Sequence, residues 1–285
     1  MRIIDAILLG LIQGLSEFLP ISSTAHLTLA GRALELIDAA HPERWTAFVA
    51  VIQLGTLIAV LAYFRRDIIA IVRAFLTENI ARRKLAEQSV ESRTGLYIII
   101  GTIPIVVIGL LFRHQIEGVF TKNLIVIGSS LVVLGLVLEL AERTARFTRS
   151  LGDVTMKDAI TIGLAQAVAL IPGSSRSGTT ITAALFSGFN REAAARFSFL
   201  LSIPAVAASG LLELVKSLKD LNRADAVAMG VATVVAGISG YMAIAFLLRY
   251  LRTRTTRIFV VYRVLLGAAI LLGVYLKYLS PDIPQ

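Results

Sequence analysis

Residues 13–26 read QGLSEFLPISSTAH, and they interrupt an apolar stretch that covers residues 3–36. A second apolar stretch, residues 159–189, is interrupted in the same way by residues 172–180, which read PGSSRSGTT. Proline and glycine break helices and serine caps them, so each stretch divides into two pieces shorter than the ~20 residues that a spanning helix needs. We therefore predict two re-entrant helix–loop–helix hairpins, which a bilayer tolerates only where protein or a watery cavity surrounds the broken backbone.

Outside these hairpins, six apolar runs have a length suited to crossing a bilayer, for which roughly 17–25 residues are needed. They cover residues 46–64, 96–112, 124–140, 194–215, 226–248 and 258–276. The composition agrees, because 56% of the 285 residues are hydrophobic and 16% are charged, whereas average soluble domains have roughly 45–50% and about 25%. The absence of cysteine excludes a disulfide scaffold, a thiolate metal site and a cysteine nucleophile. We predict an all-α polytopic membrane protein, with a single integral membrane domain over residues 1–285.

The net charge of +9 has a different meaning in a membrane protein than in a soluble one. In a soluble protein it would suggest nucleic-acid binding, which we do not expect here, whereas in a membrane protein Lys and Arg collect in cytoplasmic loops. Basic residues concentrate in residues 65–93, 143–157 and 249–257. Placing these segments in the cytoplasm puts both termini outside, with the first hairpin entering from the outer face and the second from the cytoplasm.

The two interrupted stretches also resemble each other. Residues 5–13 read DAILLGLIQ and residues 158–166 read DAITIGLAQ. After a one-residue slip, the Pro-x-Ser-Ser pattern of residues 20–23 corresponds to that of residues 172–175. We predict an internal duplication, with residues 1–150 as the first repeat and residues 151–285 as the second. Each half holds one hairpin and three spanning helices, an odd number, so the second repeat is predicted to be inverted.

Glu17, His26 and Arg176 are ionisable residues inside the interrupted stretches, where a charge is costly and usually functional. The plain structural alternative is that Glu17 pairs with Arg176 only to neutralise a buried charge, and both interpretations can hold. Gln13 and Glu17 lie four residues apart and so share one helix face. A carboxylate beside an amide oxygen suits a hard divalent cation, Mg²⁺ or Ca²⁺, which takes further ligands from phosphate.

The first hairpin tip places hydroxyl groups beside a histidine. Pro20 is expected to end the first half-helix and residues 22–24 to cap the second, which aims free backbone N–H groups and the positive end of a helix dipole at the tip. For Ser22 and Thr24, capping alone is the simpler interpretation. His26 lies in the following turn and can deprotonate a serine or protonate a leaving oxygen.

The second tip, residues 172–180, carries the densest functional signal in the chain. Its glycines let backbone amides approach an anion, its hydroxyl groups can donate to phosphate oxygens, and Arg176 offers a planar bidentate fork. No lysine follows at the spacing of a nucleotide P-loop. Two such tips that meet near the midplane would bind a substrate with a phosphate head and a lipid tail, such as a polyprenyl diphosphate.

The motifs at residues 13–26, 51–55 and 172–178 resemble those of the undecaprenyl-diphosphate phosphatases, the bacitracin-resistance family, and the resemblance extends over essentially the whole chain. It implies a multi-pass enzyme of the bacterial plasma (inner) membrane that hydrolyses undecaprenyl diphosphate to undecaprenyl phosphate and inorganic phosphate. The reaction recycles the lipid carrier for peptidoglycan synthesis and confers bacitracin resistance. The expected partners are this lipid substrate and the bilayer, with a homodimer left open and the active site reached from the outer face.

The same resemblance implies a role for each motif residue. The expected catalytic residues are Glu17, Ser23, His26 and Arg176. The expected phosphate-binding residues are Ser22, Gly173, Ser174, Ser175, Ser177 and Thr180. Glu17 and Gln13 are expected to bind Mg²⁺ or Ca²⁺, although Gln13 stands where the family has an acidic residue. Ser23 activated by His26 is the expected nucleophile, with a water activated by His26 as the variant.

Two other functions fit parts of the pattern. A polyprenyl-lipid transporter or flippase is the stronger alternative, because secondary transporters are also built from inverted repeats with broken helices. A membrane lipid phosphatase with a histidine nucleophile is weaker, because His41 and His114, the other histidines, lack the flanking motifs of that superfamily.

Overall fold

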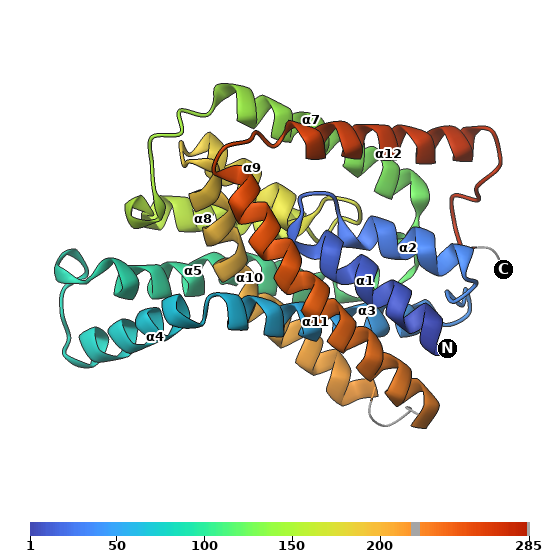
Figure 1. Cartoon of the computed structure of the whole chain (residues 1–285), viewed down its shortest axis with the longest axis horizontal. Coiled ribbons are helices and arrows are strands. Elements are labelled where there is room, and N and C mark those ends of the chain that lie inside the picture. The colour runs from blue at the N-terminus through green and yellow to red at the C-terminus, as the bar shows by residue number, and fades with distance from the viewer. Residues whose placement is uncertain (218–222, 284–285) are drawn as a thin grey trace.

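The two interrupted stretches fold as pairs of short helices (Figure 1). The computed structural model describes residues 1–217 and 223–283. The first pair is α1 (Ile3–Phe18) and α2 (Ser23–Ala33), and the second is α8 (Met156–Val168) and α9 (Arg176–Phe186). The longest of these helices, α1, has 16 residues, so none of the four is long enough to span a bilayer alone.

Six longer helices match the six predicted spanning runs. They are α3 (Pro42–Tyr63), α5 (Val90–Leu111), α7 (Leu124–Thr144), α10 (Arg191–Ser217), α11 (Arg223–Leu251) and α12 (Arg257–Tyr275). Each is long and apolar enough to cross a membrane, with a mean hydropathy between 1.8 and 2.5. No strand is present within the described ranges, so the prediction of an all-α polytopic membrane protein is confirmed.

One helix, α4 (Arg65–Ile80), was not expected from the sequence. It has no buried residue and begins with two arginines, so it is amphipathic and does not register as an apolar run. The remaining connections contain the short helix α6 (Arg113–Glu117) and the 3₁₀ turns η1 (Leu85–Glu87), η2 (Val119–Lys122) and η3 (Leu151–Asp153).

The long helices surround the two hairpins. In the first hairpin α1 packs against α11, and in the second α8 packs against α5, while α7 lies beside α12 (Figure 1). The α5–α8 contact is close, since a Cβ on Gly101 would lie 2.9 Å from the carbonyl oxygen of Ala159. At the centre, the Ser177 hydroxyl of the second tip donates to the carbonyl oxygen of Leu19 in the first tip at 3.0 Å. The two tips therefore meet.

The two tips share one backbone geometry. Ser22 caps α2 with a φ of 75°, Ser175 caps α9 with a φ of 67°, and each hydroxyl accepts from the backbone N–H three residues later. Ser22 thus corresponds to Ser175 at the same spacing that relates Asp5 to Asp158, and the predicted one-residue slip is wrong. The capping serine with positive φ occupies the same place in both turns, whereas the proline lies two residues before the cap in the first tip and three residues before it in the second. The inversion of the second half and the boundary at residue 150 stay predictions.

Lys122, at the end of η2, anchors the connection between α6 and α7. Its side chain is buried, and its ammonium group donates to the Thr46 hydroxyl at 2.5 Å and to the carbonyl oxygens of Gly118 and Glu117 at 2.8 and 3.0 Å. Burial lowers the pKa of Lys122 from 10.5 to about 8. Between these two pH values the unfolded chain binds a proton that the folded chain has released, so this residue makes the folded state more stable as the pH rises.

We expect a Lys122→Met variant to lose this component of the pH dependence. Thermal unfolding in detergent between pH 8 and 10.5 should show the melting temperature of the native protein rising relative to that of the variant. Below about pH 8 the lysine is protonated in both states, so the difference between the two proteins should become constant. Parallel pH profiles across the whole interval would contradict a buried lysine with a lowered pKa.

Candidate active site

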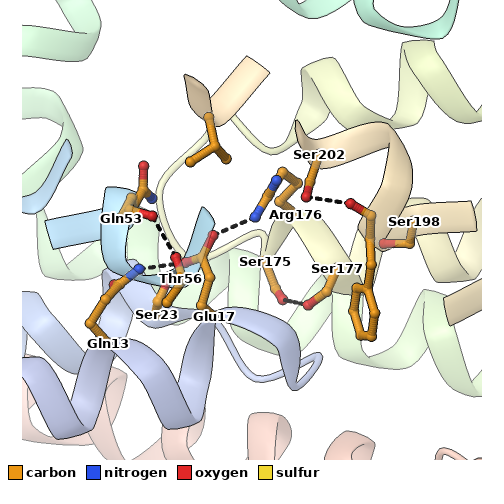
Figure 2. A network of polar contacts seen from close by, with 12 residues as sticks. Gln13, Glu17, Ser23, Gln53, Thr56, Ser175, Arg176, Ser177, Ser198 and Ser202 are labelled. Atoms are coloured by element: carbon orange, nitrogen blue, oxygen red, sulfur yellow. Dashed lines mark hydrogen bonds and ion pairs between the residues drawn. The ribbon is translucent and has the colours of Figure 1, made fainter. Parts of the chain in front are cut away.

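Glu17 is the centre of a polar cluster buried between three helices (Figure 2). Glu17 is 5% exposed, and its Oε1 accepts a 2.5 Å hydrogen bond from Arg176 Nη2 on α9. Its Oε2 accepts from Ser23 Oγ on α2 at 2.6 Å and from Gln13 Nε2 on α1 at 3.0 Å. The fold therefore brings together four of the residues that the sequence singles out, and the predicted ion pair between Glu17 and Arg176 is present.

The loop that carries Arg176 is shaped by its backbone and by hydroxyl groups. Gly173 has a φ of 87°, and a Cβ there would lie 2.5 Å from the carbonyl oxygen of Ile127, so glycine is required. Thr180 is fully buried, and its hydroxyl donates to the carbonyl oxygen of Arg176 at 2.7 Å. The same hydroxyl lies 2.6 Å from that of Ser198 on α10. These contacts hold the Arg176 backbone in place at the start of α9.

A cavity of about 390 Å³ opens beside the cluster. The predicted site residues that line it are Glu17, Ser22, Ser23, Gly173, Ser175 and Arg176. Five other predicted site residues are not among the described residues that line the cavity: Gln13, His26, Ser174, Ser177 and Thr180. Ser177 and Thr180 support the loop from behind through their hydrogen bonds, whereas the buried Ser174 hydroxyl has no partner among the described residues.

Beyond this polar base much of the cavity wall is apolar, with Gln53, Ser209 and Glu213 as polar members. The apolar part is built by Ile105, Val106 and Leu110 of α5 together with Val206 and Leu212 of α10. The lining also includes Trp45, Arg113, Glu117 and Lys122, which lie on or next to the connections at one end of the spanning helices. A cavity with one polar end and an apolar wall suits an amphiphilic ligand whose charged head is bound at the base.

His26 does not meet Ser23 in the way that the sequence suggests. Its Nδ1 lies 2.7 Å from the carbonyl oxygen of Ser22, which can only accept, so Nδ1 carries a hydrogen. In the neutral ring, Nε2 then accepts the Tyr262 hydroxyl at 2.6 Å, and the two rings stack with centroids 5.6 Å apart. The Ser23 hydroxyl donates to Glu17 instead. The bond to Ser22 leaves Nε2 as the only ring nitrogen that could act as a base, and Tyr262 occupies it, so the predicted dyad is not formed.

The oxygen atoms around Glu17 can take part in binding a divalent cation but do not form a complete site. Within the described part of the chain no group of three His, Cys, Asp or Glu residues could hold a metal. Gln13 is fully buried, and its Oε1 has no hydrogen-bond partner among the described residues. A half-turn of this amide places Oε1 beside Glu17, so the two residues would offer oxygens to a cation whose other ligands are phosphate and water.

Arg263 of α12 is a residue of this site that the sequence pattern did not single out. It lies inside the apolar run of residues 258–276, is fully buried, and donates from Nη2 to the carbonyl oxygen of Ser174 at 2.9 Å. The signal that identified Glu17 and Arg176, an ionisable residue inside a membrane-embedded segment, was present here as well.

Known proteins resemble this chain over nearly its full length. Residues 6–269 match the family described as bacitracin resistance protein BacA. A protein of Syntrophobacter fumaroxidans named undecaprenyl-diphosphatase is 55% identical over 276 residues, which cover 96% of this chain and 98% of that protein. Proteins of the same name from Myxococcus xanthus and Chlorobaculum tepidum are 50% and 46% identical, over 99% of this chain and 92% and 100% of their own lengths. The chain belongs to the bacitracin-resistance family BacA.

Proposed function

We propose that this chain is a membrane phosphatase that hydrolyses undecaprenyl diphosphate to undecaprenyl phosphate and inorganic phosphate. The observation that carries the proposal is the cluster of Glu17, Ser23 and Arg176 at the polar base of a cavity with an apolar wall. The base fits a diphosphate head and the wall fits the first part of a prenyl tail. Family membership and the name shared by the relatives support the same substrate, together with roles in peptidoglycan synthesis and bacitracin resistance.

Arg176 and the amino end of α9 bind the diphosphate. Without substrate, the Arg176 guanidinium is paired with Glu17 at 2.5 Å. A diphosphate offers more negative charge and a bidentate partner, so it competes for the guanidinium and releases the Glu17 carboxylate. The guanidinium and the free N–H groups of the first turn then stabilise the charge on the transferring phosphoryl group.

Ser23 is the nucleophile in this proposal, and Glu17 is its base. The Ser23 hydroxyl already donates to Glu17 at 2.6 Å, whereas both ring nitrogens of His26 are engaged by Ser22 and Tyr262. Attack by Ser23 Oγ on the terminal phosphorus breaks the bridging P–O bond, transfers the hydroxyl proton to Glu17 and releases undecaprenyl phosphate. Water then attacks the serine phosphate, Glu17 returns the proton to the departing serine oxygen, and inorganic phosphate leaves. Direct attack by a water bound to Glu17 is the variant.

A divalent cation, Mg²⁺ or Ca²⁺, would be held by Glu17 and Gln13. When bound it neutralises charge on the phosphate oxygens. Because Gln13 contributes an oxygen but no charge, the protein ligands alone are weak, and we infer that the cation binds together with the diphosphate.

We also propose that the site is reached from the outer face of a bacterial plasma membrane, with both termini outside. The N-terminus and the segment that ends at Ile283 lie at the same end of the molecule (Figure 1). Arg32 links the cavity lining to this end, since its guanidinium donates to the carbonyl oxygens of both Lys122 and Ser280. The concentration of basic residues in the segments assigned to the cytoplasm supports the same orientation. A homodimer is not required, because the three helices that carry the site come from one chain.

The first prediction from the proposed function separates hydrolysis from lipid transport. In detergent no membrane divides two compartments, so a phosphatase should release inorganic phosphate from undecaprenyl diphosphate there, and a flippase should not. We expect release by the purified protein and a loss of at least about 100-fold in the Glu17→Gln and Arg176→Lys variants. A protein that moves the lipid across vesicle membranes but releases no phosphate in detergent would refute the phosphatase assignment.

A double variant serves as the control for folding in this experiment. Removing one partner of a buried ion pair leaves an uncompensated charge, which typically costs about 3–5 kcal/mol, whereas removing both charges is often neutral. We therefore expect Glu17→Gln combined with Arg176→Met to melt near the native temperature and still to be inactive. Substantial turnover by this double variant would exclude both residues from the mechanism.

A second prediction concerns the nucleophile. Quenching the enzyme with SDS at neutral pH during turnover of substrate labelled in the terminal phosphate should trap a phosphoenzyme with the label on Ser23, and this label should survive later acid treatment, which a histidine phosphate would not. The Ser23→Ala variant should trap none, and His26→Gln should still trap it, because His26 does not contact the Ser23 hydroxyl. A label on His26 would overturn the assignment, and the absence of any trapped label in single-turnover experiments would favour attack by water.

A third prediction concerns the cation. Chelation should abolish hydrolysis, and added Mg²⁺ or Ca²⁺ should restore it. The Gln13→Glu variant adds a second carboxylate, so the Mg²⁺ concentration for half-maximal activity should fall on the order of tenfold. Full activity in the presence of chelator would show that Arg176 alone neutralises the diphosphate.

A further inference from the structure

Arg263 lies in the spanning helix α12, and no acidic residue in the described part of the chain forms an ion pair with it. Its side chain is fully buried, and Nη2 donates to the carbonyl oxygen of Ser174 at 2.9 Å, with those of Gly173 and Ser130 at 3.4 and 3.5 Å. The other two guanidinium nitrogens, Nε and Nη1, are buried without a partner among the described residues. A buried charge with so few partners destabilises a folded protein, so packing alone does not explain this residue.

The helices around Arg263 leave room for it at glycines. A Cβ on Gly178 would lie 2.5 Å from Nη1, and a Cβ on Gly135 of α7 would lie 3.4 Å from the Arg263 Cβ. Gly178 belongs to the first turn of α9, two residues after Arg176. Arg263 is not among the described residues that line the cavity. Its guanidinium therefore contacts the loop of residues 173–178 from a side that does not line the cavity.

The position of this guanidinium determines where one backbone amide points. In a trans peptide the C=O and the N–H of the same unit point in opposite directions. The carbonyl of Ser174 is directed at Arg263, so the N–H of Ser175, which belongs to the same peptide unit, is directed away from it. Ser175 lines the cavity. The peptide between residues 174 and 175 thus presents its donor to the diphosphate site while its acceptor is held from behind.

We propose that Arg263 is a positioning residue that holds the peptide between residues 174 and 175 with the Ser175 N–H aimed at the diphosphate. Without this guanidinium the peptide unit would be free to rotate, and its carbonyl oxygen, which repels phosphate, would reach the cavity. The inference rests on the proposed function, because it takes a diphosphate as the ligand. It adds an oriented amide donor to the charge that Arg176 supplies.

The first test replaces Arg263 with methionine, which has a similar length but no donor. We expect kcat/KM for undecaprenyl diphosphate to fall about 10- to 100-fold, through both a lower kcat and a higher KM, as for other residues that orient catalytic groups. The melting temperature should stay equal or rise, because an uncompensated buried charge has been removed. The matched control is Arg257→Met, at the exposed start of the same helix, which should leave turnover unchanged.

A second variant and a binding measurement separate positioning from folding. Arg263→Lys keeps a donor for the Ser174 carbonyl and should recover part of the lost kcat. Trp45 is the single tryptophan and lines the cavity, so its fluorescence can report the binding of inorganic pyrophosphate. We expect the Kd for pyrophosphate to rise about tenfold in Arg263→Met, on the scale of one well-placed hydrogen bond to a charged group.

Three possible results would separate a positioning role for Arg263 from a packing role and from a failure of the proposed function. Turnover by Arg263→Met within about twofold of native would overturn the proposal. So would a lowered melting temperature with native activity per folded molecule, since that is the behaviour of a residue needed only for packing. If the native protein released no phosphate but the Kd for pyrophosphate still rose in Arg263→Met, the proposed function would fail while the positioning of the Ser175 amide would stand.

Discussion

The ion pair between Glu17 and Arg176 is the interaction on which the rest of this structure depends. It joins the two hairpins at their tips, with Arg176 Nη2 at 2.5 Å from Glu17 Oε1. Neither hairpin is long enough to span a bilayer, so both broken backbones must be enclosed by the protein itself. The charges at the tips must also be neutralised there, because no water or opposite charge is available in the lipid. Both requirements are met when the two halves of the chain come together, because the hairpins then enclose each other's tips and the ion pair neutralises the two charges.

The same constraint holds together the residues of the proposed active site. A carboxylate, a guanidinium and a serine hydroxyl are held within hydrogen-bond distance before any substrate arrives. In the mechanism that we propose, a diphosphate exchanges places with one partner of the pair, which frees the carboxylate as a base and needs little rearrangement. The surrounding hydroxyl groups serve mainly to hold the backbone, as Thr180 holds the carbonyl oxygen of Arg176 and Ser177 holds that of Leu19. The proposed reactive groups at the base of the cavity are therefore few, and several neighbouring residues hold the backbone that carries them.

His26 illustrates why closeness along the chain did not identify the hydrogen-bond partner of Ser23. Residues 23 and 26 lie three apart on α2, which places them on one side of the helix. The His26 ring instead donates to the carbonyl oxygen of Ser22 and accepts from Tyr262, a residue 236 positions away. The Ser23 hydroxyl is directed at Glu17, on another helix. Which of two nearby acceptors a hydroxyl uses depends on side-chain directions that are set by packing against α1 and α12.

The sequence by itself determined the membrane class, the six spanning helices, the two broken hairpins and the residues at their tips, because these follow from local apolar length and from residues that break or cap helices. It also offered the pairing of Glu17 with Arg176 as one interpretation of these two residues, since isolated charges in such segments are costly. Only the tertiary structure decided that Ser23 pairs with Glu17, that Ser22 corresponds to Ser175, and that Arg263 donates to the carbonyl oxygen of Ser174. These depend on contacts between helices far apart in the chain, and no local pattern specifies which side chains meet across such an interface.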